Sequence, residues 1–239
     1  MVLFGFGGFS NSARTVKRNV ESAAVSEQGL VRLENQDHVL VDDLRYVYCV
    51  ADGVGGGSEG ARASEMVCRN IKMFLNECGT GFAARVAAVD KAVAEANSAI
   101  YSTARECGYK SMGSTVAVLV LDPANTRHVA VCHVGDSRVY RIRGGMPSTL
   151  TRDHRVAGSH GITRAVGVAP TVEPEWVEIE STSPSRFLLC TDGVHDVVSD
   201  PRLAAFVAAG AVDSAASRLS AEVVRCGAPD NYSFVIVSV

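Results

Sequence analysis

The sequence predicts an α+β fold, with strands in hairpin-like succession and paired helices beside them. Three observations support this prediction. Eight short runs are rich in Val, Ile, Leu or aromatic residues, as strands are. Two long segments carry an apolar stripe at helical spacing. The strands follow one another in groups instead of each alternating with a helix, which argues against a parallel doubly wound sheet.

In chain order, the first two strands are expected at residues 39–41 and 46–51, followed by long helices at 59–77 and 83–105. Six further strands are expected at residues 115–121, 128–134, 138–142, 176–179, 186–190 and 233–239. A shorter helix is expected at 201–208, and a third long one at 213–225. The helical stripes are interpreted as core packing.

With 239 residues and 47% apolar content, the chain is long enough for one large core, and no repeat or shift in composition marks a second. We expect a single domain over residues 21–239 and a flexible N-terminal extension over residues 1–20. The opening segment is apolar but interrupted by glycines, and it lacks a charged region before the apolar stretch. It therefore resembles neither a signal peptide nor a membrane span.

The formal net charge of -3 gives no general attraction to nucleic acid or to an anionic membrane. Seven cysteines form an odd set without a CxxC pair. This pattern favours reduced, buried thiols in a cytoplasmic protein over disulfides or a zinc site. A monomer is the simplest expectation for the assembly.

Four short stretches with acidic residues each lie beside a strand-like run: Asn35-Gln36-Asp37, Asp52-Gly53-Val54-Gly55-Gly56, Thr191-Asp192-Gly193 and Asp230-Asn231. A single Asp-Gly pair is usually only a turn. Together, the four stretches predict carboxylates that converge from strand ends on a divalent metal. Mg²⁺ and Mn²⁺ prefer such oxygen ligands, and two ions together can hold a hydroxide and a phosphoryl group.

In order along the chain, these stretches and four other motifs closely resemble the motif series of the metal-dependent PP2C (PPM) protein phosphatases, bacterial type, over about residues 24–239. The other motifs are Met112-Gly113-Ser114-Thr115, Val134-Gly135-Asp136-Ser137-Arg138-Val139-Tyr140, Leu150-Thr151-Arg152-Asp153-His154 and Ile162-Thr163-Arg164-Ala165-Val166-Gly167. The first acidic stretch also matches in the residues before it, Gly29-Leu30-Val31-Arg32-Leu33-Glu34. The resemblance implies a β-sandwich of two antiparallel sheets flanked by helices, with the metals at one end.

The resemblance also implies roles for individual residues. Asp52 would bridge two Mn²⁺ or Mg²⁺ ions, and the Gly53 carbonyl would complete one site, where glycine allows a tight bend of the backbone. Asp192 and Asp230 would bind the other ion. Asp37 matches an acidic residue that orients metal-bound water, in direct contact with a metal or one step removed.

A third, weaker metal site is implied at Asp136 and Asp196, although Asp136 could equally be only a turn between two strands. Arg32 matches the arginine that grips the substrate phosphate, a role that suits a planar cation that does not titrate. For an isolated arginine, the alternative is a surface salt bridge.

The implied reaction is hydrolysis of phosphoserine and phosphothreonine in proteins, without a covalent phosphoenzyme. A hydroxide that bridges the two metals would attack phosphorus while Arg32 and the metals neutralise the phosphoryl oxygens. Arg32, Asp37, Asp52 and Asp192 are the expected catalytic residues. The expected partners are phosphorylated proteins, made by an opposing serine/threonine kinase.

The sequence departs from the family pattern in three places. Gln36 stands where eukaryotic relatives have a metal-binding glutamate, although bacterial members often have glutamine there, and this change should weaken one metal site without abolishing it. Many relatives carry a histidine where Val54 or Gly57 stands here, so the acid that protonates the leaving group is unassigned. His154 and His195 are candidates by position, and metal-bound water is the alternative.

The flap beside the active site is reduced to residues 155–161, which should leave the metal centre more open. The missing histidines and the short flap keep two alternatives open, a pseudophosphatase that binds phosphoproteins and a phosphatase of small phosphorylated molecules.

Overall fold

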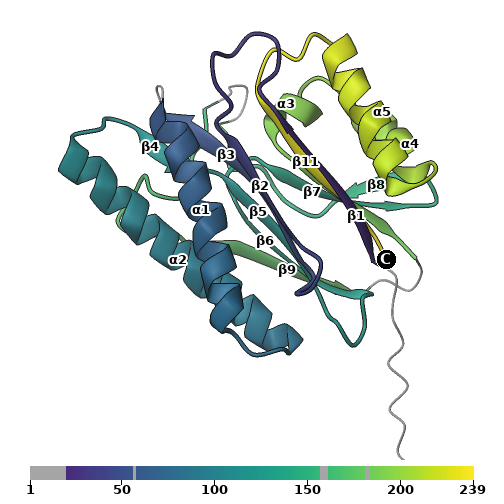
Figure 1. Cartoon of the computed structure of the whole chain (residues 1–239), viewed down its shortest axis with the longest axis horizontal. Helices are drawn as coiled ribbons and strands as arrows, with labels where there is room; N and C mark the ends of the chain where they lie inside the picture. The colour runs from purple at the N-terminus through teal and green to yellow at the C-terminus, as the bar shows by residue number, and fades with distance from the viewer. Residues whose placement is uncertain (1–19, 56–57, 157–160, 181–183) are drawn as a thin grey trace, which may run out of the picture.

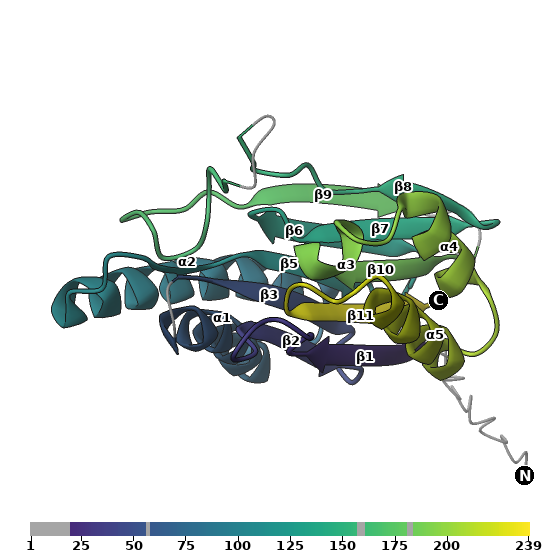
Figure 2. The same ribbon diagram turned by 90° about the horizontal axis from the view of Figure 1, so that it is seen from above.

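Two antiparallel sheets pack face to face, and helices cover the outer face of each (Figure 1 and Figure 2). This computed structural model describes residues 20–55, 58–156, 161–180 and 184–239. The four layers, helix, sheet, sheet and helix, confirm the predicted fold class. Apart from residue 20, the expected N-terminal extension lies outside the described residues, as do Gly57 and residues 157–160 of the expected flap.

The first sheet has the strand order β2-β3-β5-β6-β9, and β4 pairs with one end of β3. Its strands are β2 (Asp37–Asp42), β3 (Val47–Gly55), β4 (Met112–Ser114), β5 (Val116–Leu121), β6 (His128–Val134) and β9 (Glu175–Glu180). The second sheet has the order β1-β11-β10-β7-β8. Its strands are β1 (Glu21–Glu27), β7 (Arg138–Arg143), β8 (Met146–Thr149), β10 (Arg186–Cys190) and β11 (Tyr232–Ser238).

The long helices begin and end within two residues of the predicted positions. Helices α1 (Ser58–Glu77) and α2 (Phe82–Cys107) cover the first sheet, and α4 (Asp200–Ala208) and α5 (Val212–Arg225) cover the second. A further short helix, α3 (Asp192–His195), follows β10 directly. The last turn of α2 ends at Gly108, whose φ of 71° lets it close the helix as only glycine does readily.

The central strands are apolar on both faces because each contributes to two cores. In β3, Val47, Cys49 and Ala51 pack against the helices, whereas Tyr48 and Val50 point into the space between the sheets. A strand alternates its side chains between two faces. A strand buried on both faces therefore reads as a continuous apolar run, which is why the sequence predicted these strands well.

The elements that the sequence did not predict are short, polar or at an edge. Strand β1 carries mainly Glu, Ser and Ala, β4 has three residues and β8 has four, and α3 is a single turn. The predicted start of β3 at Tyr46 was wrong by one residue, because Tyr46 has a φ of 57° and ends a turn. The strand also continues through Asp52 to Gly55, instead of turning at the Asp-Gly pair.

The expectation of buried thiols holds for four of the seven cysteines, Cys49, Cys68, Cys132 and Cys190. Cys78 is half-buried, and Cys107 and Cys226 are exposed, so for these three the expectation was wrong. All seven thiols are free. Among the helices of the described residues, none is long and apolar enough to cross a membrane.

Candidate metal centre

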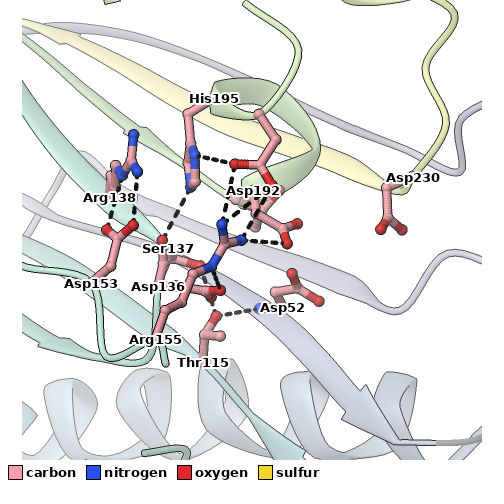
Figure 3. Close-up of polar contacts among 12 residues, drawn as sticks. Asp52, Thr115, Asp136, Ser137, Arg138, Asp153, Arg155, Asp192, His195 and Asp230 are labelled. Atoms are coloured by element: carbon pink, nitrogen blue, oxygen red, sulfur yellow. Dashed lines mark hydrogen bonds and ion pairs between the residues drawn. The ribbon is translucent and has the colours of Figure 1, made fainter. Parts of the chain in front are cut away.

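Four aspartates from separate elements meet at one end of the sandwich. Asp37 begins β2 and lies opposite Asp52 of β3 in the strand register. Asp192 begins α3, directly after β10, and Asp230 lies two residues before β11 begins. Figure 3 shows Asp52 near Asp192, with Asp230 on the far side of them, and, in addition to burial, the charges of both Asp192 and Asp230 raise the pKa of Asp52. The convergence predicted from the four acidic stretches is therefore present in the structure.

Backbone contacts fix the position of Asp52. Its N–H donates to Thr115 Oγ1 at 2.9 Å, and its carbonyl oxygen accepts from the Thr115 N–H at 2.8 Å. The Ser114 hydroxyl donates to the same carbonyl at 3.1 Å. Ser114 and Thr115 belong to a recognised motif, but nothing in their residue types indicated that they hold Asp52 in place.

Glycine is required at two positions of the centre by close packing. A Cβ on Gly53 would lie 2.2 Å from the Gly60 carbonyl oxygen, and a Cβ on Gly193 would lie 1.9 Å from the Asn231 carbonyl oxygen. Both distances are far too short for real atoms. The expected tight bend at Gly53 is wrong, because Gly53 lies within β3 and pairs with Ser114; the need for glycine comes from the neighbouring backbone.

Asp37 is almost fully buried, and only one of its two carboxylate oxygens has a hydrogen-bond partner among the described residues. Thr191 Oγ1 donates to its Oδ2 at 2.9 Å, whereas Oδ1 has no hydrogen-bond partner among the residues that the structure describes. Burial raises the pKa of the Asp37 carboxyl to about 7. A buried, unpaired carboxylate oxygen in a group of aspartates is suited to a cation or to water bound to one.

The carboxylates of the cluster carry like charges and repel one another. Burial raises the pKa of Asp52 well above its ordinary value, and the neighbouring carboxylates of Asp37 and Asp192 raise it further. Burial likewise raises the pKa of Asp192. Such crowding is costly without a counter-charge. Mn²⁺ or Mg²⁺ would supply that charge, and the oxygen-only donors fit both ions.

Arg32 lies at the edge of this cluster, where it contacts Asp230. Its Nη2 donates to Asp230 Oδ2 at 2.6 Å, and 56% of its side chain is exposed. Asn231 holds the segment that carries Arg32. Its Nδ2 donates to the carbonyl oxygens of Gln28 at 2.7 Å and Glu34 at 2.8 Å, and its Oδ1 accepts from the Gln36 N–H. Asn231 therefore steadies both the Asp230 loop and the Arg32 segment.

Asp136 and Asp196, the expected third metal site, share with Asp192 one arginine that contacts all three carboxylates. Figure 3 shows this arginine between Asp136 and Asp192. This residue is Arg155, the first residue of the shortened flap. Asp136 lies in the turn between β6 and β7, so it is a turn residue and a member of the cluster. Sequence reasoning gave Arg155 no role. Its position directly after the motif residues Asp153-His154 was the one feature that could have pointed to it.

The two histidines considered as acids are both buried and face protein groups. His195 Nε2 lies 3.1 Å from the Asp136 carbonyl oxygen, and its Nδ1 lies 3.1 Å from Asp196 Oδ1. His154 Nδ1 accepts from the Gly135 N–H at 3.1 Å, and its Nε2 lies 3.0 Å from Glu175 Oε1. Burial lowers the pKa of His154. Both rings therefore serve internal contacts.

Known proteins resemble this chain in sequence and in structure. Serine/threonine protein phosphatase PstP of Mycobacterium tuberculosis is 32% identical over 235 residues, which cover 91% of this chain but 44% of that protein. The chain thus spans less than half the length of this relative. PppA, a key regulatory component of T6SS in Pseudomonas aeruginosa, superposes with a TM-score of 0.86 at 27% identity, covering 93% of this chain and 99% of that one.

The catalytic domain of PstP in complex with two manganese ions superposes with a TM-score of 0.80 at 30% identity, covering 92% of this chain and 97% of that one. The family model described as Protein phosphatase 2C matches residues 31–225, which include all the clustered aspartates except Asp230. The chain therefore belongs to the protein phosphatase 2C family.

Proposed function

We propose that the protein hydrolyses phosphoserine and phosphothreonine in proteins with the help of two Mn²⁺ or Mg²⁺ ions. The observation that carries this proposal is the convergence of Asp37, Asp52, Asp192 and Asp230 at one end of the sandwich. The PstP catalytic domain, of related sequence and fold, binds two manganese ions. A cluster of like charges that served no cation would only destabilise the fold.

Within this proposal, Asp52 and the Gly53 carbonyl would hold one ion, and Asp52, Asp192 and Asp230 would hold the other. The ions would supply a bridging hydroxide as the nucleophile and positive charge for the phosphoryl oxygens. Asp37, whose Oδ1 has no hydrogen-bond partner among the described residues, would orient water. Thr191 and Thr115 keep Asp37 and Asp52 in position.

Arg32 would bind the phosphate of the substrate. Its exposed guanidinium is already directed at the cluster by Asp230, and its planar fork matches two phosphate oxygens. The Asp230 hydrogen bond and charge raise the pKa of Arg32, so the cation does not titrate. We assign neither His154 nor His195 as the acid that protonates the leaving group, because each would have to give up an internal contact to donate a proton. In this proposal, water donates that proton.

The proposed partners are proteins phosphorylated by a serine/threonine kinase, which the enzyme would dephosphorylate. We propose that it acts as a monomer in the cytoplasm. The support is the name of the PstP relative and the free thiols. A phosphoprotein can reach a site formed by strand ends at the surface, where Arg32 is exposed.

The test is hydrolysis of a phosphothreonine peptide and of p-nitrophenyl phosphate by purified protein with Mn²⁺, with Mg²⁺ and with EDTA, beside Asp192→Ala. We expect metal-dependent turnover that the variant loses. Folded protein that binds the phosphopeptide without turnover would identify a pseudophosphatase instead. Turnover of small phosphate esters with none of phosphopeptides or phosphoproteins would identify a small-molecule phosphatase.

A further inference from the structure

A guanidinium lies among three carboxylates beside the candidate metal pair. Arg155 Nε donates to Asp136 Oδ2 in a short hydrogen bond, Nη2 donates to Asp192 Oδ2 at 2.9 Å, and Nη1 lies 3.3 Å from Asp196. Nη2 also lies 3.3 Å from Asp196 Oδ2, so all three nitrogens of Arg155 face carboxylates. Figure 3 shows the guanidinium beside Asp136 and Asp192. The arginine uses its whole fork on this cluster, as it would on a bound anion.

The contact is shielded from water. The side chain of Asp136 is 1% exposed and that of Arg155 is 14% exposed. A carboxylate buried to this degree requires a cation in contact with it. Although burial lowers the pKa of Arg155, the hydrogen bond and charge of Asp136 raise it above its ordinary value. Arg155 is therefore a permanent positive charge at this place.

The backbone holds Arg155 where it is. Arg155 pairs with Ile162 in an isolated antiparallel bridge. On one side, the Val156 N–H donates to the Gly161 carbonyl oxygen at 2.8 Å. On the other, the His154 N–H donates to the Gly135 carbonyl oxygen at 2.9 Å, next to Asp136. The arginine and its first aspartate are thus tied together through their neighbours, which reduces the entropy lost in forming the ion pair.

We propose that Arg155 replaces a third metal ion in this enzyme. Its guanidinium neutralises Asp136, Asp192 and Asp196, so that the centre works with two metal ions and one resident arginine. Asp192 contacts Arg155 through Oδ2, and a carboxylate has a second oxygen that can bind a metal at the same time. A cation tethered to the chain does not dissociate, whereas a weakly held metal must be supplied from solution.

This inference rests on the proposed two-metal function, and counting bound metal tests it without measuring activity. Isothermal titration calorimetry with MnCl₂ on EDTA-treated, dialysed protein should give two Mn²⁺ per chain. Arg155→Met, which keeps the length of the side chain but not its charge, should bind a third. Arg152→Met, at an exposed arginine three residues earlier, is the matched control and should bind two.

A double variant tests whether the third ion binds to the carboxylates that Arg155 contacts. Arg155→Met combined with Asp136→Asn should return to two Mn²⁺. Circular dichroism checks that each variant is folded, and Arg155→Gln takes the place of Arg155→Met where the latter is not. Three Mn²⁺ on the wild type, or two on a folded Arg155→Met or Arg155→Gln protein, would overturn the inference and leave the proposed function intact. Wild-type protein that binds no Mn²⁺ would overturn both.

Discussion

Asp37 and Asp52 stand directly opposite each other across the β2–β3 ladder. Like charges at facing positions destabilise a pair of strands, and here burial raises the pKa of both carboxyls. The sheet nevertheless keeps them in register. The two strands therefore form a site in which a cation improves the stability of the fold as well as supplying chemistry.

Removing metal should therefore destabilise the protein. A ligand present at 100 times its Kd adds about 2.7 kcal/mol, and each kcal/mol shifts the Tm of a chain of this size by about 2–4 °C. We expect excess Mn²⁺ to raise the Tm by about 5–10 °C over the value in EDTA, measured by differential scanning fluorimetry. Asp52→Asn should melt higher than wild type in EDTA and gain little from Mn²⁺. A Tm that Mn²⁺ leaves unchanged would contradict this reading of the cluster.

Asp192 and His195 lie in the same turn of α3 but should differ in their effect on turnover. If Asp192 binds metal as proposed, Asp192→Ala removes a metal ligand and several kcal/mol of charge stabilisation, which predicts a loss of about a thousandfold or more in kcat/KM. His195→Ala removes contacts to Asp136 and Asp196 that are worth about 1 kcal/mol each; if both support the active geometry, the loss is about 30-fold at most. The measurement is the rate of phosphopeptide hydrolysis in Mn²⁺. Equal, complete losses in two folded variants would make His195 a member of the chemistry.

Arg32 should act mainly on substrate binding. Losing a hydrogen-bonded charge pair with phosphate costs about 1.5–3 kcal/mol. Arg32→Ala should therefore raise KM for a phosphothreonine peptide by about 10–100-fold. Arg32→Lys should recover only part of this, because a lysine lacks the planar fork. Steady-state kinetics separate KM from kcat; an unchanged KM in Arg32→Ala would show that the arginine is only the surface partner of Asp230.

The sequence predicted the elements whose physical basis is local or strongly apolar. Ile71 and Val93 on the inner faces of the two long helices, and Val118 and Leu188 in the central strands, are fully buried, so the apolar patterns of these elements are clear. Strand β1 could not be found this way. Its residues have little strand preference, and it forms because seven of them pair with β11, more than 200 positions later in the chain.

The site was predictable where its residues belong to a shared motif and unpredictable where only the fold brings them together. Asp52 and Asp192 could be named from the motifs. The placement of Arg155 between Asp136 and Asp192 depends on a turn, a bridge to Ile162 and the length of the flap. No local pattern contains that information, and an arginine after a histidine is ordinary on any surface.

Asp42 joins the metal-bearing sheet to helix α1, and this contact makes a prediction for pH. Its buried carboxylate accepts from Lys72 Nζ at 2.8 Å and from the Arg45 side chain at 3.1 Å, and Arg45 Nε in turn donates to the Leu75 carbonyl oxygen. Burial alone would raise the pKa of Asp42, but the hydrogen bonds and charges of Lys72 and Arg45 lower it below its ordinary value.

A lowered pKa means that the folded protein holds the proton less tightly than the unfolded chain does. The pair therefore stabilises the fold above the ordinary pKa of aspartate, about 3.9, and this contribution is lost as pH falls through the lowered pKa. In EDTA, Asp42→Asn should lower the free energy of unfolding by about 2 kcal/mol at pH 7. The deficit should shrink steadily as the pH falls from 5 to 3.

Urea unfolding followed by circular dichroism measures this difference, with Asp43→Asn as the control at the exposed neighbouring position. Asp43 Oδ1 accepts from the Ser22 and Tyr48 hydroxyls, and an asparagine oxygen can accept the same bonds. The control should change the free energy of unfolding by less than about 0.5 kcal/mol at either pH. A deficit for Asp42→Asn that stays the same from pH 7 to pH 3 would mean that shape and hydrogen bonding, and not charge, hold α1 against the sheet. In that case the position of α1 beside the metal centre would not depend on pH.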